Sequence, residues 1–257
     1  MNLTNNTILI TGGGTGIGRG LAEAFHKLGN KVIITGRREK LLHEVADANP
    51  GMAAVALDVD SPKAIHAFAA EVTELHPALN ILINNAGTTR REDLKTPNAT
   101  DSEAIITTNL LGPIRLTAAL LPHLQKQSAA AVINVSSGLG FVPLPLAPTY
   151  SATKAALHSL TESLRVAMRG TSVEVIEIIP PAVATDLTPN RYGDPRYMPL
   201  DEYIAEVMQN FKIEPTPQEI LVERVKFLRF AAATGSYDKA LAMLAEFQYS
   251  DGSSKLI

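Results

Sequence analysis

The sequence predicts an α/β protein built on a parallel β-sheet with helices on both faces. Short apolar runs alternate along the chain with longer stretches of helical periodicity, and a glycine-rich turn joins the first run to the first helix. Strands that alternate with helices of this length form βαβ units, whose parallel strands are buried on both sides. The 257 residues, 46% of them hydrophobic, suffice for a substantial core. No repeat or linker divides the chain, so we expect one domain.

The expected elements follow one another without interruption. Strands are expected at residues 7–10, 31–35, 52–57, 81–84, 131–136 and 173–179. Helices are expected from residue 19 onward and at 39–48, 63–76, 101–111, 113–126, 149–169 and 217–233. Right-handed crossovers in such a fold form the ligand crevice at the carboxyl ends of the strands.

Composition excludes several classes of function. The net charge of −3 gives no electrostatic basis for binding nucleic acid or an anionic membrane. The absence of cysteine excludes disulfides, thiolate metal sites and a cysteine nucleophile. The six histidines show no metal-ligand spacing and are interpreted as helix-surface residues, so no metal is expected. We find no secretory signal and no stretch that approaches a membrane span, and expect a cytoplasmic protein.

A glycine-rich turn within residues 7–20 (TILITGGGTGIGRG) connects the first expected strand to the first helix. Glycines let the backbone approach a ligand without Cβ clashes, and a helix start offers N–H groups and a positive dipole end to phosphate. Gly12, Gly16 and Gly18 fit the pattern T-G-x-x-x-G-x-G rather than G-x-G-x-x-G. The turn indicates a dinucleotide site, the alternative being an ordinary tight turn.

The end of the second expected strand indicates which nucleotide would bind. In NAD-selective sites an acidic residue about 20 positions after the glycine turn accepts the ribose 2′-OH. Here the position is Gly36, followed by Arg37 and Arg38. A small residue beside a guanidinium admits and pairs with a 2′-phosphate, which favours NADP(H), with NAD(H) possible. Alternatively, the two arginines are a solvated start to the next helix.

Four polar residues form a candidate catalytic group. Tyr150 and Lys154 are four residues apart on an expected helix and share a face, so the ammonium would lower the tyrosine pKa from about 10. Ser137 follows the fifth strand, where its hydroxyl can donate to a substrate carbonyl. Asn109 lies in a helical stretch although asparagine is a poor helix former. Each of the four residues alone has an ordinary structural explanation. Their joint occurrence would need several independent coincidences, so we favour the catalytic interpretation.

The glycine turn, the Asn-Asn-Ala-Gly segment at residues 84–87, Asn109, Ser137 and the Tyr-x-x-x-Lys pair resemble the classical short-chain dehydrogenase/reductase family over most of the chain. The resemblance implies a Rossmann-type doubly wound sheet of about six strands in the order 3-2-1-4-5-6. It implies an NAD(P)-dependent oxidoreductase, a carbonyl reductase or alcohol dehydrogenase. Tyr150 would be the general acid, and Lys154 would depress its pKa and bind the nicotinamide ribose. Ser137 would polarise the carbonyl, and Asn109 would hold a water of a proton relay.

The resemblance also assigns residues to the cofactor. Asp58 and Val59 resemble a pair that contacts adenine, Asp58 alternatively being an N-cap-like loop residue. Residues 180–185 resemble P-G-x-x-x-T, a segment that meets the nicotinamide carboxamide. The predicted cofactor-binding residues are Gly12, Thr15, Gly16, Ile17, Gly18, Arg37, Arg38, Asp58, Val59, Asn85, Ala86, Gly87, Tyr150, Lys154, Pro180, Val183 and Thr185.

The chain departs from the family pattern in two places. Pro181 replaces the usual glycine, which fixes φ and removes an N–H. Residues 234–244 read as helical or irregular where many members have a seventh strand, so we expect none; this tail is similar to the DltE-like subgroup. We expect a domain over residues 1–235, including a lid insertion at 186–214. Residues 236–257 would be a tail that packs on the domain or extends from it.

Two segments are expected to wall the substrate space. Residues 141–148 are apolar and stiffened by proline, and residues 186–214 form a long excursion typical of a lid, or else an ordinary surface loop. The lid candidates are Pro189, Tyr192, Pro195, Tyr197, Met198 and Pro199. These walls favour a small apolar or aromatic carbonyl or alcohol. Arg90 and Arg91 would attract an acidic group, or are simply solvated.

Apolar residues beyond a single stripe on two helices favour a homodimer rather than a tetramer, since the seventh strand is expected to be missing. These residues are Leu116, Ala119, Leu120, Leu124, Ala155, Leu157 and Leu160. Two alternative functions stay open. One is a non-catalytic nucleotide-binding sensor or scaffold on the same fold, although Tyr150 and Lys154 are both present. The other is an alcohol dehydrogenase that uses NAD⁺, against which Arg37 argues.

Overall fold

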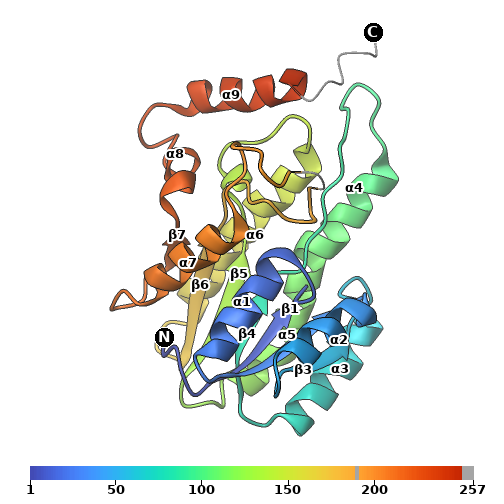
Figure 1. Ribbon diagram of the computed structural model, residues 1–257, viewed down its shortest axis with the longest axis vertical. Coiled ribbons are helices and arrows are strands. Elements are labelled where there is room, and N and C mark those ends of the chain that lie inside the picture. Colours follow the sequence, from blue (N-terminus) through green and yellow to red (C-terminus); the bar gives the residue numbers. More distant parts are fainter. Residues whose placement is uncertain (189–190, 251–257) are drawn as a thin grey trace.

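The computed structural model of the protein describes residues 1–188 and 191–250. Pro189 of the predicted lid and residues 251–257 of the predicted tail lie outside the described residues. The chain forms three layers, with a parallel sheet between two layers of helices (Figure 1). The predicted fold class is therefore confirmed.

In the part of the chain that the structure describes, the sheet contains seven parallel strands in the order β3-β2-β1-β4-β5-β6-β7. The strands are β1 (Thr7–Thr11), β2 (Lys31–Gly36), β3 (Ala53–Ala56), β4 (Leu79–Asn84), β5 (Ala130–Val135), β6 (Val173–Ile179) and β7 (Glu219–Leu221). The six predicted strands are all present, with ends within two residues of the expected ones. The predicted order is confirmed, and β7 extends it beyond β6.

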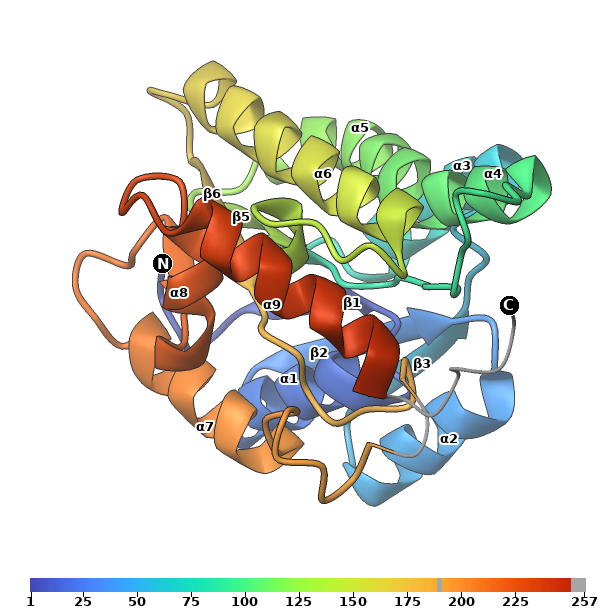
Figure 2. The same cartoon turned by 90° about the horizontal axis from the view of Figure 1, so that it is seen from above.

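The helices divide into two layers, as Figure 2 shows from above. One face of the sheet carries α1 (Gly16–Lys27), α2 (Glu39–Ala48) and α7 (Leu200–Phe211); the other carries α3 (Pro62–Leu75), α4 (Ala99–Ile106), α5 (Gly112–Leu124) and α6 (Pro148–Ala167). Side chains of β1 alternate between two buried cores. Ile8 and Ile10 pack with Phe25 of α1, and Leu9 packs with Leu120 of α5. This alternation explains why the strands read as unbroken apolar runs.

The seventh strand overturns two expectations. Instead of the helix predicted at residues 217–233, the structure has β7, a 3₁₀ turn at Glu223–Val225 and the one-turn helix α8 (Lys226–Arg229). Ile220 is buried and pairs with Ile178 of β6. A three-residue strand carries no readable alternation, so its tertiary pairing decides the conformation. The expectation of a missing seventh strand is wrong, and the argument against a tetramer that depended on it no longer holds.

Part of the predicted lid belongs to the core. Within residues 186–214, α7 packs against α1 and buries Tyr203, Val207 and Phe211. The Phe211 ring meets that of Phe25 edge-on, with 5.7 Å between centroids. A helix anchored in this way is structural, so the lid candidate is limited to residues 186–199.

The end of the described chain is the helix α9 (Tyr237–Ser250), as the helical interpretation of residues 234–244 predicts. Figure 2 shows α9 crossing between the two helix layers. Its residues Ala240 and Leu244 are buried with Val142 and Ala231. The helix therefore packs on α8 and on the loop that follows β5.

Contrary to the expectation from sequence, one helical stretch is long and apolar enough to resemble a membrane span. Residues Ala99–Leu124, which run through α4 and α5, have the length and the mean hydropathy, 1.4, of a membrane-crossing helix. A core helix of a globular fold passes the same test. In this fold the stretch packs against α3 and α6, with Leu116, Leu120 and Leu124 fully buried. These three leucines belong to the core of the subunit, so they do not form the surplus apolar face that the dimer argument used.

Candidate active site

A cavity of about 500 Å³ opens at the carboxyl ends of the strands and extends from the glycine turn to α6. Most of the predicted site residues line it: Gly12, Thr15, Gly16, Ile17, Arg37, Arg38, Val59, Asn85, Ala86, Gly87, Ser137, Tyr150, Lys154, Pro180, Val183 and Thr185. Gly18, Asp58 and Asn109 are not among its lining residues. Most of the predicted cofactor-binding residues and three of the four predicted catalytic residues therefore line one cavity.

The glycine turn lies close to the end of β4. Gly12 has a φ of +69°, and a Cβ there would lie 3.0 Å from the Ala86 Cα. A Cβ at Gly18 would lie 2.3 Å from the Gly12 carbonyl oxygen and 2.4 Å from Asn85 Nδ2, closer than real Cβ atoms come. Only glycine fits these positions. Gly18 does not line the cavity itself. Its missing side chain lets the first turn of α1 pack directly against the Gly12 carbonyl, and this contact fixes the glycine turn that does line the cavity.

Thr11, which the sequence analysis did not select, joins β1 to the Asn-Asn-Ala-Gly segment. Its hydroxyl accepts hydrogen bonds from the N–H groups of Asn85 and Ala86, each at 3.0 Å, and Asn85 Nδ2 donates to the Thr11 carbonyl at 2.9 Å. At the end of β2, the buried Thr35 hydroxyl lines the cavity and has no hydrogen-bond partner within the described chain. The Thr35 carbonyl accepts a hydrogen bond from the Gly13 N–H at 3.1 Å, so this residue borders the glycine turn. A turn whose space a Cβ would fill fits a bound dinucleotide.

Arg37 and Arg38 line the cavity beside β2. Arg37 Nη1 lies 3.3 Å from Asp60 Oδ2, with the arginine side chain 60% exposed, and Arg38 Nη2 donates to Thr15 Oγ1 at 3.0 Å. An exposed ion pair contributes less than about 1 kcal/mol, so Arg37 can exchange Asp60 for an anionic ligand. Asp58 accepts a hydrogen bond from the Asp60 N–H at 3.1 Å and lines a second, more open hollow. Its position agrees with the loop-capping alternative.

Ser137, Tyr150 and Lys154 meet at the other end of the cavity. Lys154 is buried, its Nζ donates to the Val135 carbonyl at 2.8 Å, and it lies 5.5 Å from the centroid of the Tyr150 ring. Ser137 Oγ accepts a hydrogen bond from the Leu139 N–H at 3.1 Å and lies close enough to the Tyr150 phenol to lower its pKa. The two adjacent hydroxyls can therefore approach the same carbonyl oxygen.

Burial dominates the acid–base character of this group. It raises the pKa of Tyr150 to about 12, against the hydrogen bond with Ser137, which lowers it. It also lowers the pKa of Lys154 to about 8, against the charge of Glu177. The structure thus differs from the expectation that Lys154 brings the tyrosine pKa down, because the ammonium is directed at Val135. A tyrosine with this pKa is protonated at neutral pH and suited to donating a proton.

Asn109 supports the site from outside the cavity. It is fully buried in a π-helical turn, η1 (Thr107–Leu111), between α4 and α5. Its Oδ1 accepts from the Thr88 N–H at 2.8 Å, and its Nδ2 donates to the Thr88 carbonyl at 2.9 Å and to Thr153 Oγ1 at 3.2 Å. Such turns often occur at functional sites. Asn109 therefore fixes the loop after β4 against α6; the water it would hold stays a prediction.

The segment with Pro181 remains at the cavity. The Gly138 N–H donates to the Pro180 carbonyl at 2.9 Å, and Val183 forms a β-bridge with Met198. Thr185 stands beside the glycine turn, since a Cβ at Gly16 would lie 3.2 Å from the Thr185 Cβ. The segment at residues 180–185 therefore still lines the cavity, although Pro181 stands where the family pattern has glycine.

The cavity wall near Tyr150 is largely apolar. Its lining includes Leu139, Leu144, Leu187, Tyr197, Leu228 and Leu244. Leu228 of α8 and Leu244 of α9 are not predictable from the sequence as wall residues, because a leucine on a short or amphipathic helix has the same pattern in the core and in a cavity wall. Arg90 pairs with Asp101 at 3.0 Å, and neither Arg90 nor Arg91 lines the cavity. The idea that they attract an acidic substrate group gains no support.

Comparison with known proteins agrees with this site. Residues 6–195 match the family model described as short chain dehydrogenase. The chain belongs to the short-chain dehydrogenase/reductase family. It is 41% identical over 247 residues to the uncharacterized oxidoreductase DltE of Bacillus subtilis (strain 168), spanning 93% of this chain and 96% of that protein. The predicted family and its DltE-like subgroup are thus confirmed.

Solved structures share the fold of this short-chain dehydrogenase. A short chain dehydrogenase from Burkholderia cenocepacia in complex with NADP superposes with a TM-score of 0.80 at 25% identity, covering 95% of this chain and 99% of that one. The 3-ketoacyl-(acyl-carrier-protein) reductase from Brucella melitensis complexed with NADH has a TM-score of 0.76 at 26% identity, covering 84% and 94%. The chain is therefore an oxidoreductase of this family by sequence and by fold.

Proposed function

We propose that this short-chain dehydrogenase is an NADPH-dependent reductase of small apolar or aromatic carbonyl compounds. The observation that carries the proposal is the adjacency of the Ser137 and Tyr150 hydroxyls, with Lys154 behind them, in the same cavity as the glycine cradle. A proton donor and a second hydrogen-bond donor beside a dinucleotide cradle are what carbonyl reduction needs.

The cofactor would be held along the whole cavity. The glycine turn and the start of α1 would take the phosphates, and residues 180–185 the nicotinamide end. When bound, the nicotinamide supplies the hydride. Similar structures hold NADP in one case and NADH in another, so they support a nicotinamide cofactor in general. The preference for NADPH comes from Gly36 and Arg37, because a guanidinium pairs with a 2′-phosphate and no carboxylate stands there to repel it.

The protein residues perform the proton chemistry. As hydride adds to the carbonyl carbon, the carbonyl oxygen gains negative charge and takes the proton from the Tyr150 hydroxyl. Ser137 donates a hydrogen bond to that oxygen in the transition state. The phenolate that Tyr150 leaves then takes up a proton from solvent, and the Lys154 ammonium would bind the nicotinamide ribose.

The acid–base state of the site favours the reductive direction. With its pKa raised to about 12, Tyr150 carries its proton throughout the neutral range. Reduction consumes that proton, whereas alcohol oxidation requires the phenolate form. The same geometry therefore serves reduction more readily than oxidation at neutral pH.

The substrate end supports an apolar carbonyl compound. Leucines 139, 144, 228 and 244 face it from three separate segments, and Tyr197 and Leu187 come from the lid candidate, residues 186–199. Leu187 is 43% exposed, as suits a residue at the mouth of the cavity. We infer that closure of this segment excludes water during hydride transfer.

We further infer a homodimer through the layer of α4, α5 and α6. Ile106, Ile114 and Val166 of this layer are exposed, with Val166 at 55%. An isologous contact would cover them. A cytoplasmic location stays a prediction.

Titration of the purified protein with NADPH and with NADH, followed by nicotinamide fluorescence, tests the proposal. Tighter binding of NADPH supports the site and the role of Arg37. Tighter binding of NADH would be consistent with an oxidoreductase but would contradict the role of Gly36 and Arg37 in selecting NADPH. If folded protein binds neither, the scaffold alternative replaces the reductase.

A further inference from the structure

A row of polar side chains crosses the sheet beneath α6, where a sheet covered on both faces is expected to be apolar. Asn84, Asn134, Glu177 and Glu219 are register partners on the successive strands β4 to β7. Asn84 Nδ2 donates to Asn134 Oδ1 at 2.9 Å, and Asn134 Nδ2 donates to Thr161 Oγ1 of α6 at 2.9 Å. The row therefore faces the helix that carries the catalytic tyrosine and lysine.

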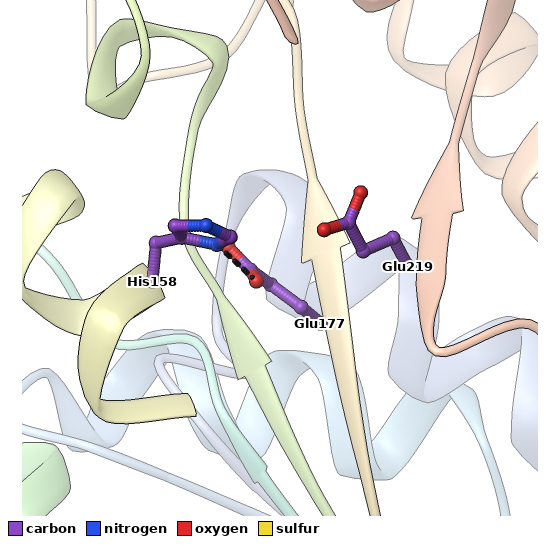
Figure 3. Close-up of side chains that lie close together, drawn as sticks. All are labelled: His158, Glu177 and Glu219. Carbon is purple, nitrogen blue, oxygen red and sulfur yellow. Dashed lines mark hydrogen bonds and ion pairs between the residues drawn. The ribbon is translucent and has the colours of Figure 1, made fainter. Parts of the chain in front are cut away.

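Glu177 is a carboxylic residue with no exposed surface. Its Oε1 accepts a hydrogen bond from the Ser136 hydroxyl at 2.5 Å, and its Oε2 lies 2.8 Å from His158 Nδ1. His158, expected on a helix surface, is instead turned toward Glu177 (Figure 3), and this contact raises the pKa of His158. A buried carboxylate is unfavourable unless such partners hold it. We call Glu177 and its two partners, Ser136 and His158, the Ser136–Glu177–His158 clasp; its two hydrogen bonds hold the buried Glu177 carboxylate in place.

The same region does not require a metal ion. Ligand atoms of His158, Glu177 and Glu219 lie within 4.8 Å of one another, and Figure 3 shows all three side chains around one space. However, Arg229 donates to both Glu219 oxygens, from Nε at 2.8 Å and from Nη2 at 2.7 Å. This guanidinium already balances the acidic charge and would repel a cation. The role of Glu177 therefore lies in its protein contacts.

Ser136 connects Glu177 to the catalytic groups. The carbonyl of Val135, the residue before it, accepts the hydrogen bond of Lys154, and the hydroxyl of Ser137, the residue after it, acts on the Tyr150 phenol. The Ser136 side chain holds the end of β5 between these two contacts. Anchoring Ser136 to Glu177 therefore fixes both catalytic contacts at once.

The second partner of Glu177 stands on the catalytic helix. His158 lies one turn after Lys154 on α6, so the clasp ties α6 to the end of β5 and to β6. The negative charge of Glu177 also acts on Lys154, where it raises the pKa that burial lowers. The contacts of Glu177 and its charge thus both act on Lys154.

We propose that Glu177 is a positioning residue of this active site, which aligns Ser137 with Tyr150 through Ser136 and, through His158, fixes the turn of α6 that carries Lys154 beside its negative charge. The proposal rests on the proposed reductase function. The charged groups that face the Glu177–His158 pair are Lys154 and Glu162 from α6, Glu219 from β7 and Arg229 from α8. Of the acidic residues among these, Glu177 is the one whose charge acts on Lys154.

Glu177→Gln tests the electrostatic part, since glutamine keeps the size and an acceptor oxygen for Ser136 but removes the charge. The pKa of Lys154 is measured by NMR on protein with ¹³C-labelled lysine, its resonance assigned by its loss in Lys154→Met. We expect wild-type Lys154 to titrate near pH 8. In Glu177→Gln its pKa falls by about one pH unit, the effect of losing a neighbouring opposite charge. An unchanged Lys154 pKa overturns this part.

Glu219→Gln is the matched control, because it makes the same change at the next position of the row and Glu219 has no contact with Ser136 among the hydrogen bonds of the described chain. Lys154 is expected to titrate there as in the wild type. A shift as large as in Glu177→Gln would mean that loss of any nearby carboxylate suffices, which contradicts a specific role of Glu177.

Ser136→Ala tests the alignment part, since it removes the clasp hydroxyl and leaves the Glu177 charge. We expect an unchanged Lys154 pKa, a kcat for carbonyl reduction at least about tenfold lower, and an unchanged KM for NADPH. An unchanged kcat overturns the alignment role. If Glu177→Gln does not fold, the kcat of Ser136→Ala alone decides whether the proposal holds.

The titration needs neither substrate nor cofactor, which separates the two proposals. Wild type that shows the Lys154 coupling but oxidises no NADPH with any carbonyl contradicts the reductase function alone. Active wild type whose Glu177→Gln variant titrates normally contradicts the role of Glu177 alone.

Discussion

Replacement of Lys154 by methionine is expected to abolish catalysis and yet stabilise the fold. The side chain is 4% exposed, and burial lowers its pKa from 10.5 to about 8. The folded state thus holds the ammonium less favourably than the unfolded chain does, by about 3 kcal/mol at neutral pH. Methionine removes this penalty at similar volume. It also loses the hydrogen bond to the Val135 carbonyl, worth about 1 kcal/mol. The expected net gain in unfolding free energy is about 2 kcal/mol at pH 7.

The sign of the pH dependence follows from the lowered folded-state pKa. The penalty is fully present below about pH 8 and disappears as the pH rises from there to 10.5, where the lysine of the unfolded chain also loses its proton. At about pH 9.5 it has fallen to about 1 kcal/mol, and the gain from methionine vanishes.

Denaturant unfolding of wild type and Lys154→Met at both pH values measures the effect. Lys40→Met, at a side chain 89% exposed, is the control and should show no such pH dependence. No stabilisation at pH 7, or an equal change at both pH values, refutes the reasoning.

Three further predictions concern the cofactor and the proton donor. Arg37→Asp should weaken NADPH binding about tenfold or more and shift preference toward NADH, because it exchanges a phosphate partner for a repelling charge; unchanged selectivity in the fluorescence titration contradicts the role of Arg37. Gly18→Ala should abolish binding of both cofactors, since its Cβ would lie 2.3 Å from the Gly12 carbonyl oxygen; normal binding would show that the cradle adjusts. Alcohol oxidation should accelerate by about tenfold per pH unit between pH 7 and 9, because the phenolate form of Tyr150 becomes more populated; a flat kcat/KM over this range contradicts Tyr150 as the base.

The parts of the site that the sequence predicts are those encoded by local spacing. Tyr150 and Lys154 are one helical turn apart, and the glycine turn follows its strand directly, so each is readable without the rest of the fold. The six predicted strands are readable as well, because burial on both sides makes most of them apolar runs, although the edge strand β3 is only half-buried. The structure brings these residues together at the carboxyl ends of the strands, as the parallel topology requires.

What the sequence does not predict depends on contacts between distant segments. Strand β7 forms because Ile220 pairs with Ile178, and α7 belongs to the core because Tyr203 packs against α1. The partnership of Glu177 with His158 joins a strand to a helix across 19 positions. The direction of the Tyr150 pKa shift depends on depth of burial, which no local pattern records.

The most direct test of the reductase function is NADPH oxidation in the presence of apolar ketones and aldehydes, with wild type and Tyr150→Phe compared. Phenylalanine keeps the ring and removes the hydroxyl that donates the proton. We expect wild type to reduce at least one such carbonyl, and Tyr150→Phe to bind NADPH normally while reducing it at least about a thousandfold more slowly. Reduction by Tyr150→Phe at the wild-type rate would contradict the central claim.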